Sequence, residues 1–431
     1  MTKRTAYLNA RLLDPASQLD VVGDLLVEDG KITDFGPGTF KAGMLSPNQT
    51  VDCEGLCLSP GLFDIRVQVR EPGEEHKESI ATASEAAAAG GVTAMCCLPN
   101  TDPVIDDVSV LEFIARRARE IKSVKLFCYG TLTRGLDGRE LTEMALLSET
   151  GALAFTDGVK SVHDPLVLRR ALSYARTFDL LIVQHPEEER LSDDGVMNEG
   201  EVATRLGLPG IPAVAEVMAI ERDLRILSLT GGRYHVAHVS TAAGIDAIRK
   251  AKRDRYNVTC DTAPHYFALN ETAVGDYRTF AKVSPPLRDE ADRRAVVEGL
   301  ADGTIDIIAS DHAPHDEDSK RLPFAQAEFG IIGLETLLPL TLELYHNGDL
   351  SLLDALAKIT SKPADLLGCP FGRLERGAPA DLLLFNLEKP RQIEEKTFRS
   401  KSKNSPFDKR PVQGVVMRTV VEGRAIFTAV P

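Results

Sequence analysis

The chain lacks the features that would place it on a membrane or on nucleic acid. No apolar run approaches the ~20 residues of a membrane-spanning helix, and no apolar region follows residues 1–7, so we expect neither a membrane span nor a signal peptide. Its 50 Lys and Arg stand against 64 Asp and Glu, which gives a formal net charge of −14. Because nucleic acid and anionic membranes both require a basic patch, we expect neither partner and predict a cytoplasmic protein.

The short motifs of several enzyme classes are also missing. There is no Walker sequence, no dinucleotide-binding glycine fingerprint and no Gly-x-Ser-x-Gly elbow. The seven cysteines, an odd number, lie scattered at positions 53, 57, 96, 97, 128, 260 and 369. Their apolar settings predict reduced, buried thiols. A metal-dependent hydrolase and a binding protein remain as the two interpretations.

The middle of the chain alternates apolar strands with helical segments. We predict strands at 62–69, 92–98, 124–129, 152–155, 180–184, 234–239, 258–260 and 305–309. Helical patterns between them include 79–89, 108–121, 166–177, 242–252 and 292–300. Eight strands that alternate with helices favour an α/β fold with a closed (β/α)8, TIM-type barrel over an open doubly wound sheet.

Both ends of the chain are rich in β-sheet patterns. Residues 24–33 read as a hairpin around an Asp-Gly turn, and residues 380–386 and 415–427 are strand-like. We therefore predict a small β-sandwich-like domain built from 1–55 and 372–431, around a barrel at 56–371. The polar segment 392–409 is predicted to be an extended surface loop.

Chemistry in such a barrel is built at the carboxyl ends of the strands. The residues found at or just past the last four predicted ends are His185, His238, His265, and Asp311 with His315. A lone histidine there is more often a hydrogen-bonded core group, but three that converge on an acid indicate a site. Two of the imidazoles and Asp311 suit one Zn²⁺ ion, or Asp311 could shuttle a proton. Arg70 suits a substrate carboxylate.

Longer motifs span nearly the whole chain. They are Ser59-Pro-Gly-Leu-Phe-Asp64, Arg70-Glu-Pro-Gly-Glu-Glu-His-Lys77, Leu98-Pro-Asn-Thr-Asp-Pro103, Ala237-His-Val-Ser-Thr241, Thr262-Ala-Pro-His265, Ser284-Pro-Pro-Leu-Arg288, Ser310-Asp-His-Ala-Pro-His315 and Phe329-Gly330. In these the chain resembles the class I dihydroorotases of the amidohydrolase superfamily, which interconvert carbamoyl-aspartate and dihydroorotate. The resemblance implies a metal-bearing barrel with a small β domain from both termini.

The chain departs from this family on the first strand. The family motif Asp-x-His-x-His, whose histidines bind the more buried metal, is here Asp64-Ile-Arg66-Val-Gln68. Arg66 is a permanent cation with no lone pair for a metal, and Gln68 offers only a weak carbonyl ligand. At a distance of a few ångströms Arg66 would repel a cation strongly, so a binuclear site is not expected.

A second departure lies on the fourth strand. The family's Phe-Ser/Thr-Asp-Asp-Gly pattern is here Phe155-Thr-Asp157-Gly158, one acid short. Without a gap, Gly158 takes the position of the bridging acid and Asp157 is its neighbour. Ser284 likewise replaces the asparagine of the family's Asn-Pro-Pro-Leu-Arg motif. One interpretation is that Arg66 replaces the first metal electrostatically by pairing with Asp157 or Asp311.

Other family residues are retained. By resemblance, His185 and His238 are ligands of the second metal and Asp311 is the proton shuttle. The implied substrate contacts are Arg70, Asn100, His315, Phe329 and Gly330. At most one Zn²⁺ ion is expected, with Asp157 or Asp311 beside the two histidines.

These observations support three hypotheses. The first is a non-catalytic or impaired dihydroorotase-like protein of pyrimidine biosynthesis, acting as a structural partner of aspartate carbamoyltransferase and therefore oligomeric. The basis for this hypothesis is the loss of metal ligands from two strands, because the family's hydrolysis depends on metal-bound hydroxide. The second is an active dihydroorotase with one zinc ion, because the residues that contact carbamoyl-aspartate or dihydroorotate are mostly present. The third is another cyclic amidohydrolase, or a pseudoenzyme that senses a pyrimidine precursor.

Overall fold

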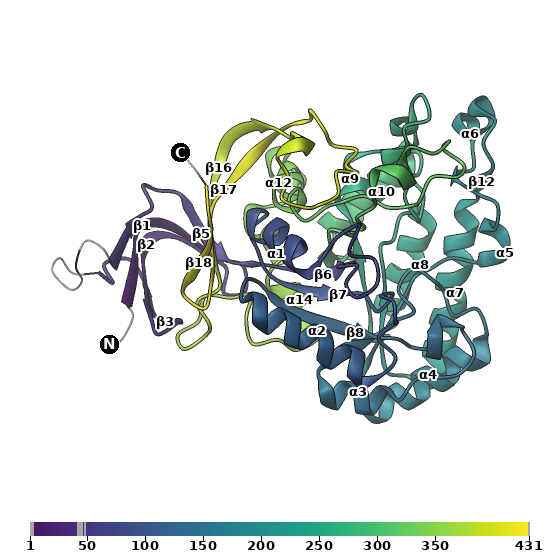
Figure 1. Ribbon diagram of the computed structural model, residues 1–431, viewed down its shortest axis with the longest axis horizontal. Coiled ribbons are helices and arrows are strands. Elements are labelled where there is room, and N and C mark those ends of the chain that lie inside the picture. Colours follow the sequence, from purple (N-terminus) through teal and green to yellow (C-terminus); the bar gives the residue numbers. More distant parts are fainter. Residues whose placement is uncertain (1–3, 41–45, 47–48, 430–431) are drawn as a thin grey trace.

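The central part of the chain forms a parallel barrel. The computed structural model describes residues 4–40, 46 and 49–429. Eight parallel strands are hydrogen-bonded in chain order (Figure 1): β6 (Leu62–Val67), β7 (Val92–Cys97), β8 (Lys125–Gly130), β9 (Ala152–Phe155), β10 (Leu181–Gln184), β13 (Arg233–Val236), β14 (Val258–Thr262) and β15 (Ile307–Ile308). Beyond β15, Val67 pairs with His312, and the Gln68 N–H donates to the His312 carbonyl at 2.9 Å. The predicted barrel is confirmed, and it is nearly closed at this seam.

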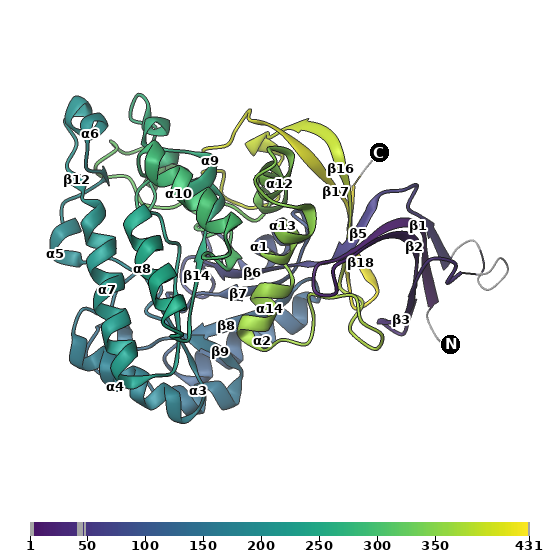
Figure 2. The same cartoon turned by 180° about the vertical axis from the view of Figure 1, so that it is seen from behind.

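Helices surround the barrel (Figures 1 and 2). They include α1 (Ile80–Ala89), α2 (Val108–Ile121), α3 (Met144–Thr150), α4 (Pro165–Thr177), α7 (Ala213–Thr230), α8 (Ala242–Arg253), α10 (Glu290–Ala301), α12 (Leu337–His346), α13 (Leu352–Ala357) and α14 (Ser361–Leu367). Short ones are α5 (Glu189–Ser192), α6 (Glu201–Leu206), α9 (Pro264–Ala268) and α11 (Glu317–Lys320). Helix α7 lies outside the predicted helices, because buried Glu216 and Asp223 interrupt its apolar face. Within the described ranges, no helix has the length and apolarity needed to cross a bilayer.

A second sheet is built from both ends of the chain. It contains β1 (Arg4–Asp14), β2 (Leu19–Glu28), β3 (Lys31–Gly36), β4 (Thr50–Asp52), β5 (Cys57–Pro60), β16 (Leu382–Gln392), β17 (Pro411–Val421) and β18 (Arg424–Thr428). Strand β5 joins the two halves, because it pairs with β1 on one side and β16 on the other. This sheet lies at one end of the molecule (Figures 1 and 2). The exact domain boundaries at 55/56 and 371/372 stay a prediction.

A further pair of two-residue strands, β11 (Met197–Asn198) and β12 (Gly210–Ile211), lies in the excursion between β10 and α7. The barrel and the small sheet each have an apolar core of buried side chains. All seven cysteines are free; six are buried, and Cys369 is partly exposed. The predicted reduced thiols therefore fill core positions.

The polar segment 392–409 is not the extended surface loop that its composition predicts. Ser400, Asn404 and Ser405 are each no more than 1% exposed. Ser400 donates its hydroxyl to the buried Glu78 carboxylate, and Asn404 bonds to the loops at the barrel mouth. The prediction was wrong because these side chains are satisfied by buried partners, which composition does not show.

Candidate functional site at the barrel mouth

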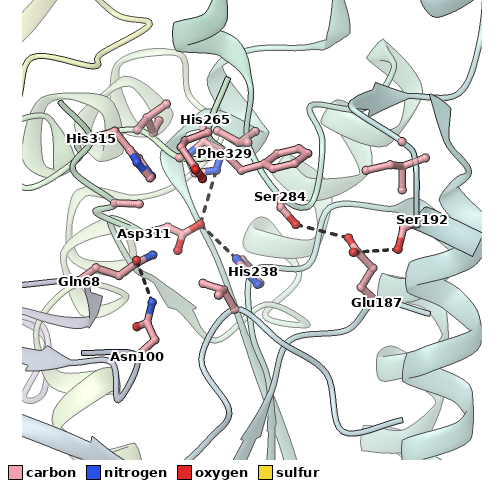
Figure 3. A pocket seen from close by; sticks show the side chains of 18 of the residues that line it. Gln68, Asn100, Glu187, Ser192, His238, His265, Ser284, Asp311, His315 and Phe329 are labelled. Atoms are coloured by element: carbon pink, nitrogen blue, oxygen red, sulfur yellow. Dashed lines mark hydrogen bonds and ion pairs between the residues drawn. The ribbon is translucent and has the colours of Figure 1, made fainter. Parts of the chain in front are cut away.

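A cavity of about 430 Å³ opens at the carboxyl ends of the barrel strands (Figure 3). Most of the predicted site residues line it: Gln68, Arg70, Asn100, His238, Asp311, His315, Phe329 and Gly330. His265, Glu187 and Ser284 line it as well. His185 does not line this cavity but lines an adjoining cleft, which shares Val159, Glu187 and Glu189 with it.

The floor of the site is organised around Arg66, which is 2% exposed. Its Nε donates to Asp311 Oδ1 at 2.9 Å, and its Nη2 donates to the Gly158 carbonyl at 3.1 Å. The same Nη2 lies 3.3 Å from His238 Nε2. The guanidinium therefore reaches the bridging-acid position on one side and the retained histidine and acid on the other. Of the two carboxylates considered from sequence, Asp311 is its partner.

The two retained histidines contact each other. His185 Nδ1 lies 2.7 Å from His238 Nε2, so one imidazole donates to the other. His238 Nδ1 lies 3.1 Å from Asp311 Oδ2. Asp311 thereby holds Arg66 with one oxygen and His238 with the other, as part of one connected network.

Asp157 is held away from this network. Its Oδ1 accepts hydrogen bonds from the Leu132 and Thr133 backbone N–H groups, at 3.0 and 2.9 Å, and its Oδ2 accepts from the Thr133 hydroxyl. Gly158 has a φ of +71°, a backbone conformation that side chains rarely adopt. Asp157 is thus used to fix the loop after β8, and the structure does not bring it to the histidines.

Charge and burial set the protonation states of the floor. Burial alone would raise the pKa of Asp311, but His238 and Arg66 outweigh it and hold the pKa well below its usual range. Burial, His238 and Arg66 all lower the pKa of His185. Burial lowers the pKa of His265 to about 4, although Asp311 opposes this. At neutral pH Asp311 is a carboxylate, while His185 and His265 are neutral.

These residues do not fit the metal that the resemblance implies. Two nitrogens bound to one zinc in tetrahedral geometry are roughly 3.4 Å apart, whereas His185 Nδ1 and His238 Nε2 are 2.7 Å apart and hydrogen-bonded. The Arg66 guanidinium borders the same His238 nitrogen, and a buried cation there opposes a second cation. Among the described residues, no group of three or more His, Cys, Asp or Glu side chains is arranged to hold a metal ion.

The wall of the cavity carries the predicted substrate contacts. Arg70 Nη2 lies 3.1 Å from His315 Nε2, and Arg70 Nη1 donates to Glu74 at 2.9 Å. Asn100 Nδ2 donates to Gln68 Oε1 at 3.1 Å (Figure 3). Burial, together with Arg70, lowers the pKa of His315 to about 2, so this imidazole is neutral. The structure therefore brings the wall residues together at one cavity.

Two residues that contact this wall from behind, without lining the cavity, were not predicted from sequence. Asn404 donates from Nδ2 to the carbonyls of Ala313 and Gly330, at 3.0 and 3.1 Å, and accepts the His315 N–H at 3.1 Å. Lys282 places its Nζ 4.4 Å from the ring centre of Phe329. The only sequence signal for Asn404 was its place in a polar segment, which points equally to solvent.

Backbone strain marks the same site. Arg70, His238 and Asp311 have φ values of +61°, +35° and +52°, although none is glycine. Such conformations cost of order 1–3 kcal/mol each and persist where surrounding contacts over-determine them. Here the interactions of Arg66 and Asp311 supply part of that constraint.

Comparison with known proteins places this site in a family. Residues 55–243 match the Dihydro-orotase-like family. The chain is 48% identical over 427 residues to a dihydroorotase of Anaplasma phagocytophilum (strain HZ), covering 98% of this chain and 95% of that relative. It is 46% identical over 419 residues to a dihydroorotase of Syntrophotalea carbinolica (strain DSM 2380 / NBRC 103641 / GraBd1), covering 97% and 98% of the two chains.

A solved structure extends the likeness to the fold. An L-hydantoinase (dihydropyrimidinase) from Arthrobacter aurescens has a TM-score of 0.86 at 26% identity, covering 98% of this chain and 95% of that one. The barrel, its terminal sheet and its cavity thus define an amidohydrolase-type protein. Within that class, the chain belongs to the dihydroorotase family.

Proposed function

We propose that this chain is a dihydroorotase-family protein without metal-dependent hydrolytic activity, which serves pyrimidine biosynthesis as a structural partner of aspartate carbamoyltransferase. The observation that carries the first part is the Arg66 guanidinium, bound to Asp311 and adjacent to His238 in the barrel floor. Dihydroorotase chemistry of the family's kind requires a metal to activate water. The nitrogen and oxygen atoms of this floor are hydrogen-bonded to one another, and their arrangement does not fit that metal.

Asp311 is also unsuited to proton transfer in this arrangement. A general base works best with a pKa near the working pH, whereas the pKa of Asp311 lies well below its usual range. Its two oxygens are engaged by Arg66 and His238. The carboxylate is thereby used as a counter-ion, which supports a structural role for the barrel.

The partner rests on the resemblance of the chain to metal-deficient dihydroorotase-like proteins. Loss of the first-strand histidines together with retention of the whole fold is the pattern expected of a protein kept for assembly. A chain that only assembles with a partner still needs a packed barrel core, so its fold is retained as it is in an enzyme.

A second candidate is an active dihydroorotase with a single zinc ion. It is favoured by the relatives that cover nearly the whole chain and are named dihydroorotases. The cavity wall with Arg70, Asn100 and His315 also favours it. For this candidate, Arg66 would have to leave the floor when the metal binds.

One purification distinguishes the two. The full-length chain is prepared with added Zn²⁺, its metal content is measured, and dihydroorotate formation from carbamoyl-aspartate is assayed. We expect less than about 0.1 zinc per chain and no turnover above the blank. The same preparation with a co-expressed aspartate carbamoyltransferase from the same genome should yield a stable complex.

Near-stoichiometric zinc with turnover would overturn the non-catalytic part of the proposal. A monodisperse chain that never retains the carbamoyltransferase would overturn the partner. A matched variant, Arg66→His with Gln68→His and Gly158→Asp, restores the three family ligands. An added Cβ at Gly158 has its nearest neighbours in Asn100 at 3.6 Å, so there is space for it. The φ of +71° strains most side chains, but aspartate is among the residues that tolerate it best. Zinc uptake by this variant alone would assign the defect to these positions.

A further inference from the structure

A second cleft lies away from the barrel mouth, between α12 and the ends of β16 and β17, which both views place side by side (Figures 1 and 2). It encloses about 760 Å³. None of its lining residues lines the barrel-mouth cavity. Its charged or titratable lining residues are Arg391, Arg410, His346 and Glu343.

Two of these residues neutralise each other. Arg410 donates to the Glu343 carboxylate from Nε at 2.9 Å and from Nη2 at 2.8 Å. This two-pronged pairing uses both carboxylate oxygens. Glu343 is therefore engaged by Arg410, and among the residues that line the cleft no other carboxylate pairs with Arg391.

Arg391 also has a buried donor without an acceptor. Its Nη2 donates to the Glu335 carbonyl at 3.2 Å, but its buried Nε has no partner among the described residues. The buried Nε2 of His346, in the same cleft, has none either. Buried polar groups are nearly always paired, and a charged donor left unpaired is costly. Arg391 Nε–H thus lacks an acceptor, and His346 Nε2 lacks a partner, on two residues that line one cleft.

Glu335 does not supply that acceptor. One of its carboxylate oxygens accepts the backbone N–H groups of Arg399 and Ser400, at 2.7 and 3.1 Å. Burial raises the pKa of Glu335 to about 7. Its negative charge is therefore partial at neutral pH, so it compensates Arg391 only in part, and its hydrogen bond with Arg391 is through the backbone carbonyl.

We propose that this cleft is a binding site for an oxyanion group, a phosphate or a carboxylate, anchored by Arg391 with His346 as a second polar contact. A guanidinium with an unpaired Nε–H suits either group, since each presents oxygens that accept hydrogen bonds from such donors. The buried position of Nε makes such a contact stronger than at an open surface. The site is independent of whether the barrel hydrolyses anything.

Binding is tested on the full-length chain by calorimetric titration with inorganic phosphate, and separately with succinate, against sodium chloride at matched ionic strength. We expect saturable binding of at least one anion by the wild-type protein. Arg391→Gln should weaken it by roughly tenfold or more, because a charge-assisted hydrogen bond is lost. Arg399→Gln, an exposed arginine of the adjoining segment, should leave binding unchanged.

Two further variants make the result decisive. Arg70→Gln removes the cation of the barrel-mouth cavity, and anion binding should survive it. His346→Gln provides a second lesion in the cleft if Arg391→Gln fails to fold, and it should weaken binding about threefold or more. Binding that is lost in Arg70→Gln but kept in Arg391→Gln would overturn the site, as would no saturable binding of either anion. Preference for phosphate over succinate, or the reverse, identifies the source of the oxyanion.

Discussion

The floor and the wall of the barrel-mouth cavity differ in where the partners of their polar groups lie. In the floor, Arg66, Asp311 and His238 are bonded to one another; Arg66 and His238 are buried, and the Asp311 side chain is 11% exposed. In the wall, Arg70 and Asn100 also have protein partners, yet they face an open cavity of about 430 Å³. The difference shows that this fold can keep a ligand-sized cavity without a metal centre. The buried guanidinium of Arg66 lies where the family binds a metal, and the cavity above it stays open.

The largest expected effect comes from breaking the floor. Arg66→Met leaves the Asp311 carboxylate buried without its cation, which should cost about 3–5 kcal/mol of unfolding free energy. Urea unfolding of the full-length chain measures it. The matched control is Arg4→Met, which removes an exposed 3.0 Å pair with Glu28 and should cost less than about 1 kcal/mol. Equal effects at both positions would contradict the importance assigned to the floor.

A second prediction concerns acid sensitivity. The pKa of His265 is lowered from 6.5 to about 4, so the folded chain binds this proton less tightly than the unfolded chain. Above pH 6.5 this imidazole is neutral in both the folded and the unfolded chain, so it does not change the free energy of unfolding. As the pH drops from 6.5 to 4, the free energy of unfolding falls by roughly 3 kcal/mol. Asp311, with a lowered pKa, adds a loss only below about pH 4.

The measurement is the free energy of unfolding between pH 4 and 7.5 for the wild type and for His265→Gln. The variant should lose part of the slope between pH 6.5 and 4, because His185 and His315, whose pKa values are also lowered, contribute with the same sign. The difference between the two profiles isolates the share of His265. His76→Gln changes an exposed histidine and should keep the wild-type profile. An unchanged slope in His265→Gln would disprove the prediction.

The third prediction sharpens the description of the wall. Asn404→Ala removes the side chain that joins the His315 loop to Gly330, and it leaves buried backbone groups unpaired. We expect a loss of about 2–3 kcal/mol, measured by urea unfolding. Gln392→Ala removes an exposed amide-to-carbonyl bond of the same segment, at 2.9 Å, and should cost under about 1 kcal/mol. A similar loss of unfolding free energy in both variants would contradict the greater importance given to the buried hydrogen bonds of Asn404.

The smallest effect is expected at Gln68. Gln68→Ala removes the acceptor of the Asn100 amide at 3.1 Å, but the cavity gives water access to that amide. The cost should therefore be about 1 kcal/mol or less. Thermal unfolding in parallel with Arg66→Met checks it, and a loss as large as that of Arg66→Met would remove the distinction between floor and wall.

Much of the site was predictable because strand ends are encoded locally. The apolar runs before His185, His238 and Asp311 form the barrel strands, and parallel strands bring their carboxyl ends to one edge. The departures at Arg66, Gln68 and Gly158 were also visible, since each residue type has fixed ligand chemistry. The segment 392–409 was not predictable, because a polar composition is the same whether its partners are water or buried groups.

The sequence by itself determined the fold class, the cluster of polar strand ends and the loss of family metal ligands at three positions on two strands, because these depend on periodicity and on residue chemistry. Only the tertiary structure decided that Arg66 pairs with Asp311 while Asp157 fixes a loop, since from the sequence either acid could have been the partner of Arg66. It also decided that Asn404 belongs to the site. These outcomes depend on the direction of side chains across the barrel, and that direction is set by packing between segments far apart in sequence.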